Sequence, residues 1–151
     1  WLEIEIDTHG DELTISARGS RGERPAPQKL APEQGLDALN NFCNKVARCV
    51  RARKELDPSA IEVSQAIHGD VLKGDLRDIL VRMTDPSKAR PEEPRENRVL
   101  VRLFVRDRAL LGIPWEALCK PGTTEGFWGT DPRLLLARGV NSSDPLVPRE
   151  V

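Results

Sequence analysis

Residues 98–105, RVLVRLFV, decide the kind of fold that this chain can adopt. Side chains along a strand alternate between two faces, and here both faces are apolar: Val99, Val101, Leu103 and Val105 on one, Leu100 and Phe104 on the other. Apolar residues on both faces are typical of a strand inside a covered sheet. We therefore expect a core strand here, and a second buried strand in the run LLLARGV, residues 134–140.

Two strands are also predicted at the start of the chain. In LEIEID (2–7) and ELTISA (12–17), apolar residues alternate with polar ones, the pattern of half-buried strands. The segment THGD between them indicates a hairpin.

Helices are expected between the hairpin and the core strands. From Leu36, apolar positions recur at spacings of three and four, which predicts an amphipathic helix with cations at its end; the positions are Leu39, Phe42, Cys43, Val46, Ala47 and Val50. Asp57 and Pro58 form a helix start signal. They open a second helical region that reaches Met83. Gly69 and Gly74 are the positions at which this region can split into two helices.

Two segments rich in proline and charge, residues 18–35 and 84–97, are predicted to be exposed loops. The expected order is thus a strand hairpin, two amphipathic helices and then core strands of a mixed sheet. This order indicates an α/β or α+β unit, and the length of 151 residues suits one domain or part of a larger one.

The composition, 38% hydrophobic and 31% charged with a net charge of −1, is that of a globular chain. This bulk charge, and aromatic residues that do not interleave with a basic stripe, lead us to expect no direct nucleic-acid binding. No apolar run approaches the roughly 20 residues that cross a bilayer, and the start WLEIEIDTHG lacks the features of a signal peptide. We expect a cytoplasmic protein without a membrane partner, trimmed from something longer because it begins at Trp1.

The search for a catalytic or metal site gives little. Cys43, Cys49 and Cys119 lack metal-site spacing and are expected to be free, mostly buried thiols. We expect His9 to be exposed in a turn and His68 to be a hydrogen-bonded residue at a helix bend. A catalytic pair of His68 with Cys43 or Cys49 is the minor alternative. No metal and no cofactor are predicted. Arginines at 98, 102, 106 and 108 are interpreted as the wetter face and edge of a strand.

Pro114, Trp115 and Glu116 form the one conspicuous local motif, inside LLGIPWEALCKP, residues 110–121. Proline restricts the backbone of its own residue and of the residue before it. We therefore expect a strand end that turns into a short helix at Trp115, with the indole buried and Glu116 paired to a backbone amide or an arginine. From the residues alone this is a structural corner.

The order of these segments resembles the N-terminal half of a CHAT domain, the caspase-like cysteine peptidase module common in bacteria. The resemblance covers residues 98–141 and rests on Val101, Leu103, Leu111, Pro114, Trp115, Glu116, Leu118, Gly126, Phe127, Leu136 and Arg138. Trp128 and Cys119 depart from the family pattern. The resemblance implies a caspase-like α/β fold for the whole of residues 1–151.

The resemblance also implies what this chain does. The family's catalytic His-Gly pair and cysteine lie downstream of the arginine-bearing strand. His68 and Gly69 come before the corner, and Cys119 follows it too closely, so neither takes over a catalytic role. We expect a non-catalytic N-terminal region that packs on the catalytic half of the peptidase or on a second chain.

Such modules act on protein substrates, are often joined to a sensor domain or respond to an activating ligand, and serve in antiviral defence, including CRISPR-associated systems, or in regulated cell death. The alternative is a regulatory or protein-interaction module without peptidase activity.

Overall fold

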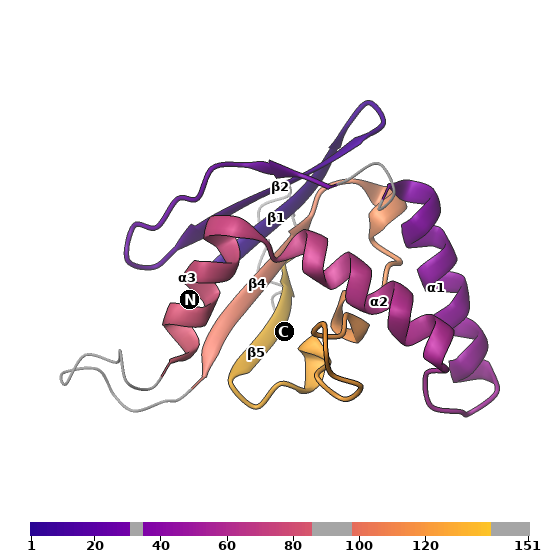
Figure 1. Cartoon of the computed structure of the whole chain (residues 1–151). Helices are drawn as coiled ribbons and strands as arrows, with labels where there is room; N and C mark the ends of the chain where they lie inside the picture. The colour runs from indigo at the N-terminus through magenta and orange to yellow at the C-terminus, as the bar shows by residue number, and fades with distance from the viewer. Residues whose placement is uncertain (31–34, 86–97, 140–151) are drawn as a thin grey trace, which may run out of the picture.

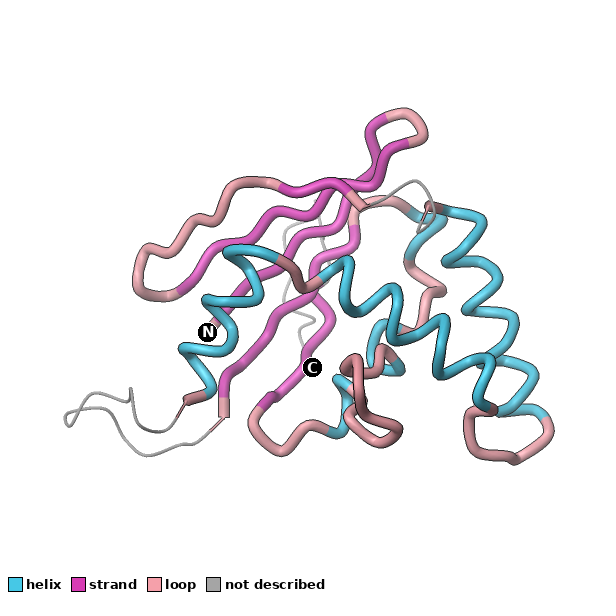
Figure 2. The backbone as a smooth tube through the Cα atoms, in the orientation of Figure 1, coloured by secondary structure: helices cyan, strands magenta, loops and turns pink. Residues whose placement is uncertain are grey.

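A mixed five-stranded sheet organises the residues that the computed structural model describes, 1–30, 35–85 and 98–139. The strands are β1 (Leu2–His9), β2 (Glu12–Gly19), β3 (Gln28–Lys29), β4 (Val99–Val105) and β5 (Leu134–Gly139), in the spatial order β3-β2-β1-β4-β5 (Figures 1 and 2). Three helices accompany the sheet, and the predicted α/β class is confirmed.

The N-terminal hairpin forms as predicted. Strands β1 and β2 pair antiparallel along their whole length, from Leu2 opposite Gly19 to His9 opposite Glu12. The turn between them contains Gly10, whose φ of 65° is a left-handed conformation that glycine adopts without steric cost. The hairpin thus fixes which side chains of both strands face the helices.

The centre of the sheet is parallel. β4 lies beside β1, with Ile4 opposite Leu103, and β5 lies beside β4, with Val101 opposite Leu136. The three helices therefore belong to the connection that leads from the hairpin to β4. Residues 98–105 do form a central strand, as the apolar pattern indicates.

The helices are α1 (Leu36–Arg51), α2 (Pro58–Val71) and α3 (Gly74–Thr84). Asp57 caps α2 by accepting a hydrogen bond from the Ala60 amide at 2.8 Å. The second helical region is interrupted at Gly74, which has a φ of 54°, whereas Gly69 lies inside α2. The division of this region that the glycines suggested thus occurs at Gly74 and not at Gly69, and it gives three helices in place of two.

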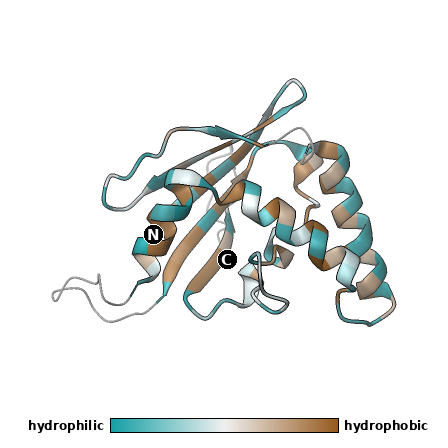
Figure 3. Cartoon of the chain, in the orientation of Figure 1, coloured by the Kyte–Doolittle hydropathy of each residue, from teal (hydrophilic) through white to brown (hydrophobic). Residues whose placement is uncertain are grey.

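Helix α3 and the end of α2 lie over one face of the sheet, and α1 packs beside α2 (Figure 1). The core between them contains Leu2, Ile4 and Ile6 of β1, with alternate residues of β2 and β4. Apolar stretches run along β4 and β5 in Figure 3. We call the opposite face, which carries Glu3, Glu5, Arg102 and Phe104, the outer face of the sheet.

The outer face corrects two predictions. On β4, Leu100 and Phe104 are only half-buried, so among the described residues the strand is covered fully on one face alone. Among the described strands, β5 lies at the edge of the sheet. It is not fully buried, since Leu134 is buried but Leu135 is 54% exposed. Val140 lies outside the described residues.

The pattern also misplaced one face position of α1. Val50 was expected on the apolar face, but its side chain is 67% exposed and Cys49 is buried in its place. The helix itself begins at Leu36 as predicted.

The loop predictions hold only in part. Strand β2 continues to Gly19, β3 pairs with β2, and Leu30 is buried, so the segment 18–35 is partly anchored on the sheet. The side chain of Gln28 also donates to the backbone oxygen of Val71. In the segment 84–97, Thr84 is the last residue of α3, and residues 86–97 lie outside the described part.

No helix in the described ranges is both long enough and apolar enough to cross a membrane.

Candidate functional site at the Pro-Trp-Glu corner

The chain leaves β4 through a series of tight turns. The strand ends at Val105, and the 3₁₀ turn η3 (Arg108–Leu110) follows, capped by Asp107, whose carboxylate accepts from the Ala109 amide at 2.8 Å. The expectation that a strand runs directly into the corner is therefore wrong. The reason is local: Asp107 favours a cap over a continued strand.

Pro114 makes the turn itself. Its φ of −80° and ψ of 73°, with the Trp115 amide donating to the Ile113 oxygen at 2.9 Å, define an inverse γ-turn. A one-turn 3₁₀ helix, η4 (Trp115–Ala117), begins at the next residue. The short helix predicted at Trp115 is confirmed.

Trp115 anchors this corner in the core. Its side chain is fully buried, and Nε1 donates to the backbone oxygen of Leu110 at 3.3 Å. The ring therefore buries its apolar surface without leaving its N–H unsatisfied. Leu110, Ile113 and Leu118 belong to the same buried cluster.

Glu116 and Arg138 connect the corner to β5. The guanidinium donates to both carboxylate oxygens, Nε to Oε1 at 2.5 Å and Nη2 to Oε2 at 2.8 Å. Its remaining N–H groups donate to the backbone oxygens of Leu111 and Ile113, both at 2.8 Å. Hydrogen bonding from Arg138 holds the pKa of Glu116 below its usual value. The prediction that Glu116 pairs with an arginine is confirmed.

The segment after the corner folds back onto it. The amide of Trp128, in the 3₁₀ turn η5 (Trp128–Thr130), donates to the Leu118 oxygen at 2.8 Å. Gly129 lies so close to Glu116 that a Cβ atom on it would be 2.9 Å from the Glu116 Cβ. The corner is thus enclosed between β5 and η5.

Helix α2 holds the corner from the other side. The buried hydroxyl of Ser64 donates to the Ala117 oxygen at 2.7 Å and accepts from the Cys119 amide at 2.6 Å. Gln65 Nε2 donates to the Thr123 oxygen at 2.5 Å. Sequence reasoning missed both residues. The sequence did contain one signal: Ser64 lies at helical spacing from the apolar residues Ala60 and Ile67, on the buried face of α2.

His68 lies one turn beyond Ser64, in contact with Trp128, and their rings meet edge to face with centroids 6.0 Å apart. Burial, with the positive charge of Lys120 as a second cause, lowers the pKa of His68 to about 4. Its Nδ1 atom is buried and has no hydrogen-bond partner among the described residues. The expectation that the His68 imidazole is hydrogen-bonded is wrong at Nδ1, and His68 lies inside α2. The neutral imidazole serves here as a packing group.

The three cysteines are free thiols, as predicted, and Cys49 and Cys119 are buried. Cys43 Sγ lies 3.5 Å from the Gly112 oxygen, Cys49 Sγ 3.8 Å from Asp57 Oδ2, and Cys119 Sγ 3.3 Å from the Thr123 oxygen. None of these sulfur contacts involves a histidine. Within the part of the chain that is described, the geometry thus offers no activated thiol.

His9 is exposed as expected, but it is the last residue of β1, paired with Glu12, and does not lie in the turn. On the outer face, Arg102 pairs with Glu3 at 3.2 Å and Arg106 pairs with Glu5 at 2.8 Å. The wet-face interpretation of the strand arginines is confirmed for these two.

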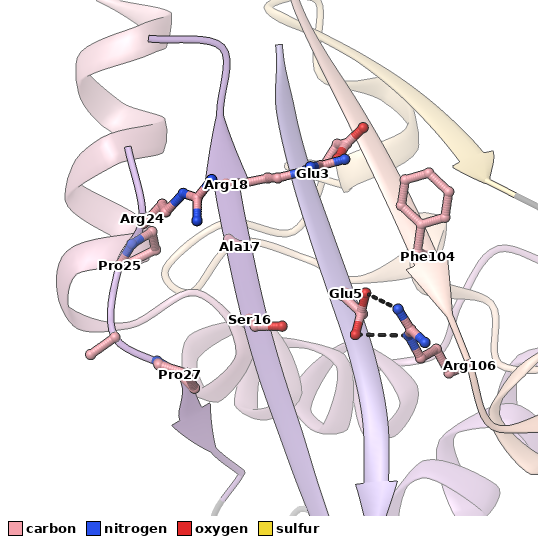
Figure 4. A pocket seen from close by; sticks show the side chains of 11 residues that line it. Glu3, Glu5, Ser16, Ala17, Arg18, Arg24, Pro25, Pro27, Phe104 and Arg106 are labelled. Carbon is pink, nitrogen blue, oxygen red and sulfur yellow. Dashed lines mark hydrogen bonds and ion pairs between the residues drawn. The ribbon is translucent and has the colours of Figure 1, made fainter. Parts of the chain in front are cut away.

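The outer face also contains an open depression of about 650 Å³ (Figure 4). It is lined by Glu3, Glu5, Ser16, Ala17, Arg18, Arg24, Pro25, Ala26, Pro27, Phe104 and Arg106. In Figure 4 the Glu5–Arg106 pair lies on one side and Arg24 on the other. Hydrogen bonds from Arg18 and Arg102 hold the pKa of Glu3 below its usual value, so the floor of this depression is charged at neutral pH.

Among the residues described, no group of three or more histidine, cysteine, aspartate or glutamate side chains is arranged to hold a metal ion. The contacts of Pro114, Trp115 and Glu116 are contacts within the fold, and Arg138 is the fourth member of this corner.

Comparison with known proteins returns no relative: no protein-family model, no curated protein and no solved structure matches the chain.

Proposed function

We propose that this chain is the non-catalytic N-terminal region of a CHAT-type, caspase-like cysteine peptidase that acts in bacterial defence or regulated cell death. It supplies the first strands of the sheet and the corner that supports them, and it packs against the catalytic half. The three free thiols support a reducing compartment, the cytoplasm.

One observation carries this proposal. Four of the positions on which the family resemblance rests, Leu111, Trp115, Glu116 and Arg138, lie in two separate segments of the sequence and meet at the corner. Arg138 of β5 binds the Glu116 carboxylate and two backbone oxygens of the corner, and Trp115 anchors that corner in the core. The resemblance thus includes residues that also meet in space, and this supports the proposal.

The sheet provides further support. β1, β4 and β5 are parallel, and parallel sheets in proteins are ordinarily covered on both faces. β5 is the last strand on its side among the described residues, and Leu135 is exposed on it. A following strand beside β5, and helices over the outer face, would complete a caspase-like sheet.

In the complete enzyme the resemblance implies a histidine-activated thiolate that attacks a peptide carbonyl. The dyad would stand at the ends of strands that follow β5. The contribution of this chain is positional, because the corner fixes β5 through Arg138 and so fixes the edge on which the next strand forms.

The coding sequence downstream of residue 151 tests the proposal. A continuation into strands that end in a His-Gly pair and then in a cysteine supports it, and the complete protein should then react with a peptide-based thiol probe at that cysteine. Replacement of that cysteine by alanine is the control. A continuation without either motif contradicts the proposal.

The outer face favours a second candidate, a regulatory or protein-interaction module. Its charged, open depression gives a partner protein a polar surface to bind. A downstream sequence unrelated to a peptidase favours this candidate.

A further inference from the structure

The end of α1 concentrates positive charge without compensating acids. Residues 38–54 contain no aspartate or glutamate, although the chain has 24 acidic residues. The same segment contains the cations Lys45, Arg48, Arg51, Arg53 and Lys54. The positive charge is therefore local, in a chain whose net charge is −1.

Four of these side chains, Arg48, Arg51, Arg53 and Lys54, are exposed, and we call them the basic tip. None of the four makes a side-chain hydrogen bond or ion pair with another described residue. Lys45, in contrast, donates to the Ser59 hydroxyl at 2.6 Å. The apolar side chain of Val50 is exposed among them. Figure 1 places this end of α1 and the loop that follows it away from the sheet.

Arg53 has a left-handed backbone conformation, which glycine adopts more easily than arginine. Its φ is 52°, and it is the only non-glycine residue with positive φ in the described ranges. The Arg53 amide donates to the Val50 oxygen and the Lys54 amide to the Cys49 oxygen, both at 3.0 Å. These two bonds define a Schellman motif, in which glycine usually occupies the left-handed position. Arginine is strained there.

The helix dipole explains only part of this arrangement. Cations in the last turn of a helix are stabilised by its C-terminal carbonyl groups, which accounts for Arg48 and Arg51. It does not account for an arginine at a position where glycine avoids the strain. The stability of α1 therefore does not explain why arginine occupies this position.

We propose that the basic tip is a docking site for an acidic peptide segment of a partner protein that also presents an apolar side chain. The four cations match its carboxylates, and the exposed Val50 matches its apolar residue. A long polyanion such as duplex nucleic acid fits less well, because the net charge of the chain is −1 and Val50 offers nothing to a phosphate backbone. The site lies on α1, apart from the corner, and does not depend on the proposed function.

Two acidic residues, Glu55 and Asp57, follow the basic tip, and the Asp57 carboxylate already accepts a hydrogen bond. Asp57 accepts from the Ala60 amide at 2.8 Å and lies 3.8 Å from Cys49 Sγ. The Asp57 carboxylate is thus directed into the start of α2, and neither Glu55 nor Asp57 pairs with a cation of the basic tip.

The test is an NMR titration of the complete chain, labelled with ¹⁵N, at low salt. The probe is a peptide of glutamates and leucines, and its control is the same peptide with every glutamate replaced by glutamine. We expect amide shifts confined to the end of α1 and the loop after it, only with the acidic peptide, and weakened by added salt. A duplex oligonucleotide is the third probe.

Two variants separate binding from stability. Arg53→Gly should raise the melting temperature, because glycine relieves the strain, and yet weaken peptide binding about threefold to fivefold, as expected for one exposed ion pair. Arg51→Gln should weaken binding by a similar factor. Arg77→Gln, which changes an exposed arginine on α3, should leave the affinity unchanged.

Three outcomes would overturn the proposal. They are the absence of shifts with the acidic peptide, shifts of equal size at arginines over the whole surface, and tighter binding of the oligonucleotide than of the peptide. Unchanged peptide affinity in the Arg53→Gly variant would equally contradict it, since that variant keeps the helix end folded.

Discussion

Trp115 is the residue on which the corner depends most. Because its side chain is fully buried, we expect Trp115→Ala to lower the free energy of unfolding by about 3 to 5 kcal/mol, the usual range for a large aromatic residue removed from a core. Urea unfolding followed by far-UV circular dichroism measures this loss.

Leu111→Ala is the matched control for that experiment. Leu111 lies in the same motif but is half exposed, so its replacement should change stability by less than about 1 kcal/mol. Equal losses in both variants would mean that the indole does not anchor the corner.

His68 gives the chain a predictable response to acid. Its pKa is lowered from 6.5 to about 4 by burial, so between these values the unfolded chain binds a proton that the folded chain does not. The free energy of unfolding should therefore be complete above pH 6.5 and fall by about 3 kcal/mol as the pH drops toward 4. Urea midpoints measured across this range give the slope.

His68→Phe provides the test of this assignment, because phenylalanine keeps the contact with Trp128 and does not titrate. The slope between pH 6.5 and 4 should become shallower in this variant and persist in His9→Gln, since His9 is exposed. If His68→Phe retained the full slope, another group would be responsible.

At the scale of elements, the packing of η5 on the corner depends on Gly129. A Cβ atom there would meet the Glu116 Cβ at 2.9 Å and its backbone oxygen at 3.2 Å. Gly129→Ala should therefore destabilise the domain by about 1 to 3 kcal/mol through overpacking. Thermal unfolding measures the effect. Gly112→Ala, where no atom lies within 4 Å of the added Cβ, should have no such cost.

The elements that could be predicted are those whose pattern is local. Alternation along residues 2–7 and 12–17 predicted the hairpin, and Asp57 with Pro58 predicted the start of α2. The two-residue strand β3 could not be predicted, because it exists only through its pairing with β2. The exposure of Leu135 could not be predicted either, because an apolar run has the same sequence pattern in a buried strand and in an edge strand.

The same distinction applies to the corner. Pro114 indicates a turn because it restricts the backbone, and Trp115 indicates a buried ring because its side chain is large and apolar. The pairing of Glu116 with Arg138 of β5 could not be predicted from the sequence. Arg138 reaches the corner only through the parallel pairing of β5 with β4. Ser64 is missed for the same reason: its partners lie on a segment more than fifty residues further along the chain.

At the scale of the whole molecule, the described elements converge on the Pro-Trp-Glu corner. Helix α3 and the end of α2 lie over one face of the sheet (Figure 1). Helix α2 and β5 hold the corner between them, and the polar atoms of that corner largely bind one another. Groups that are engaged in this way are poorly placed to react with a substrate.

The last prediction concerns activity. The cysteine sulfurs contact backbone oxygens or carboxylates, with Thr123 Oγ1 as the one hydroxyl in reach, and the buried imidazole of His68 is neutral above a pKa of about 4. We therefore expect the isolated chain to hydrolyse no peptide in a fluorogenic assay. In the complete peptidase that we propose, His9→Ala and His68→Phe should leave kcat/KM within a few-fold, whereas loss of a true general base costs on the order of 10²-fold or more. Peptide turnover by the isolated chain that His68→Phe abolishes would place the catalytic base in this region and overturn its assignment to a following segment.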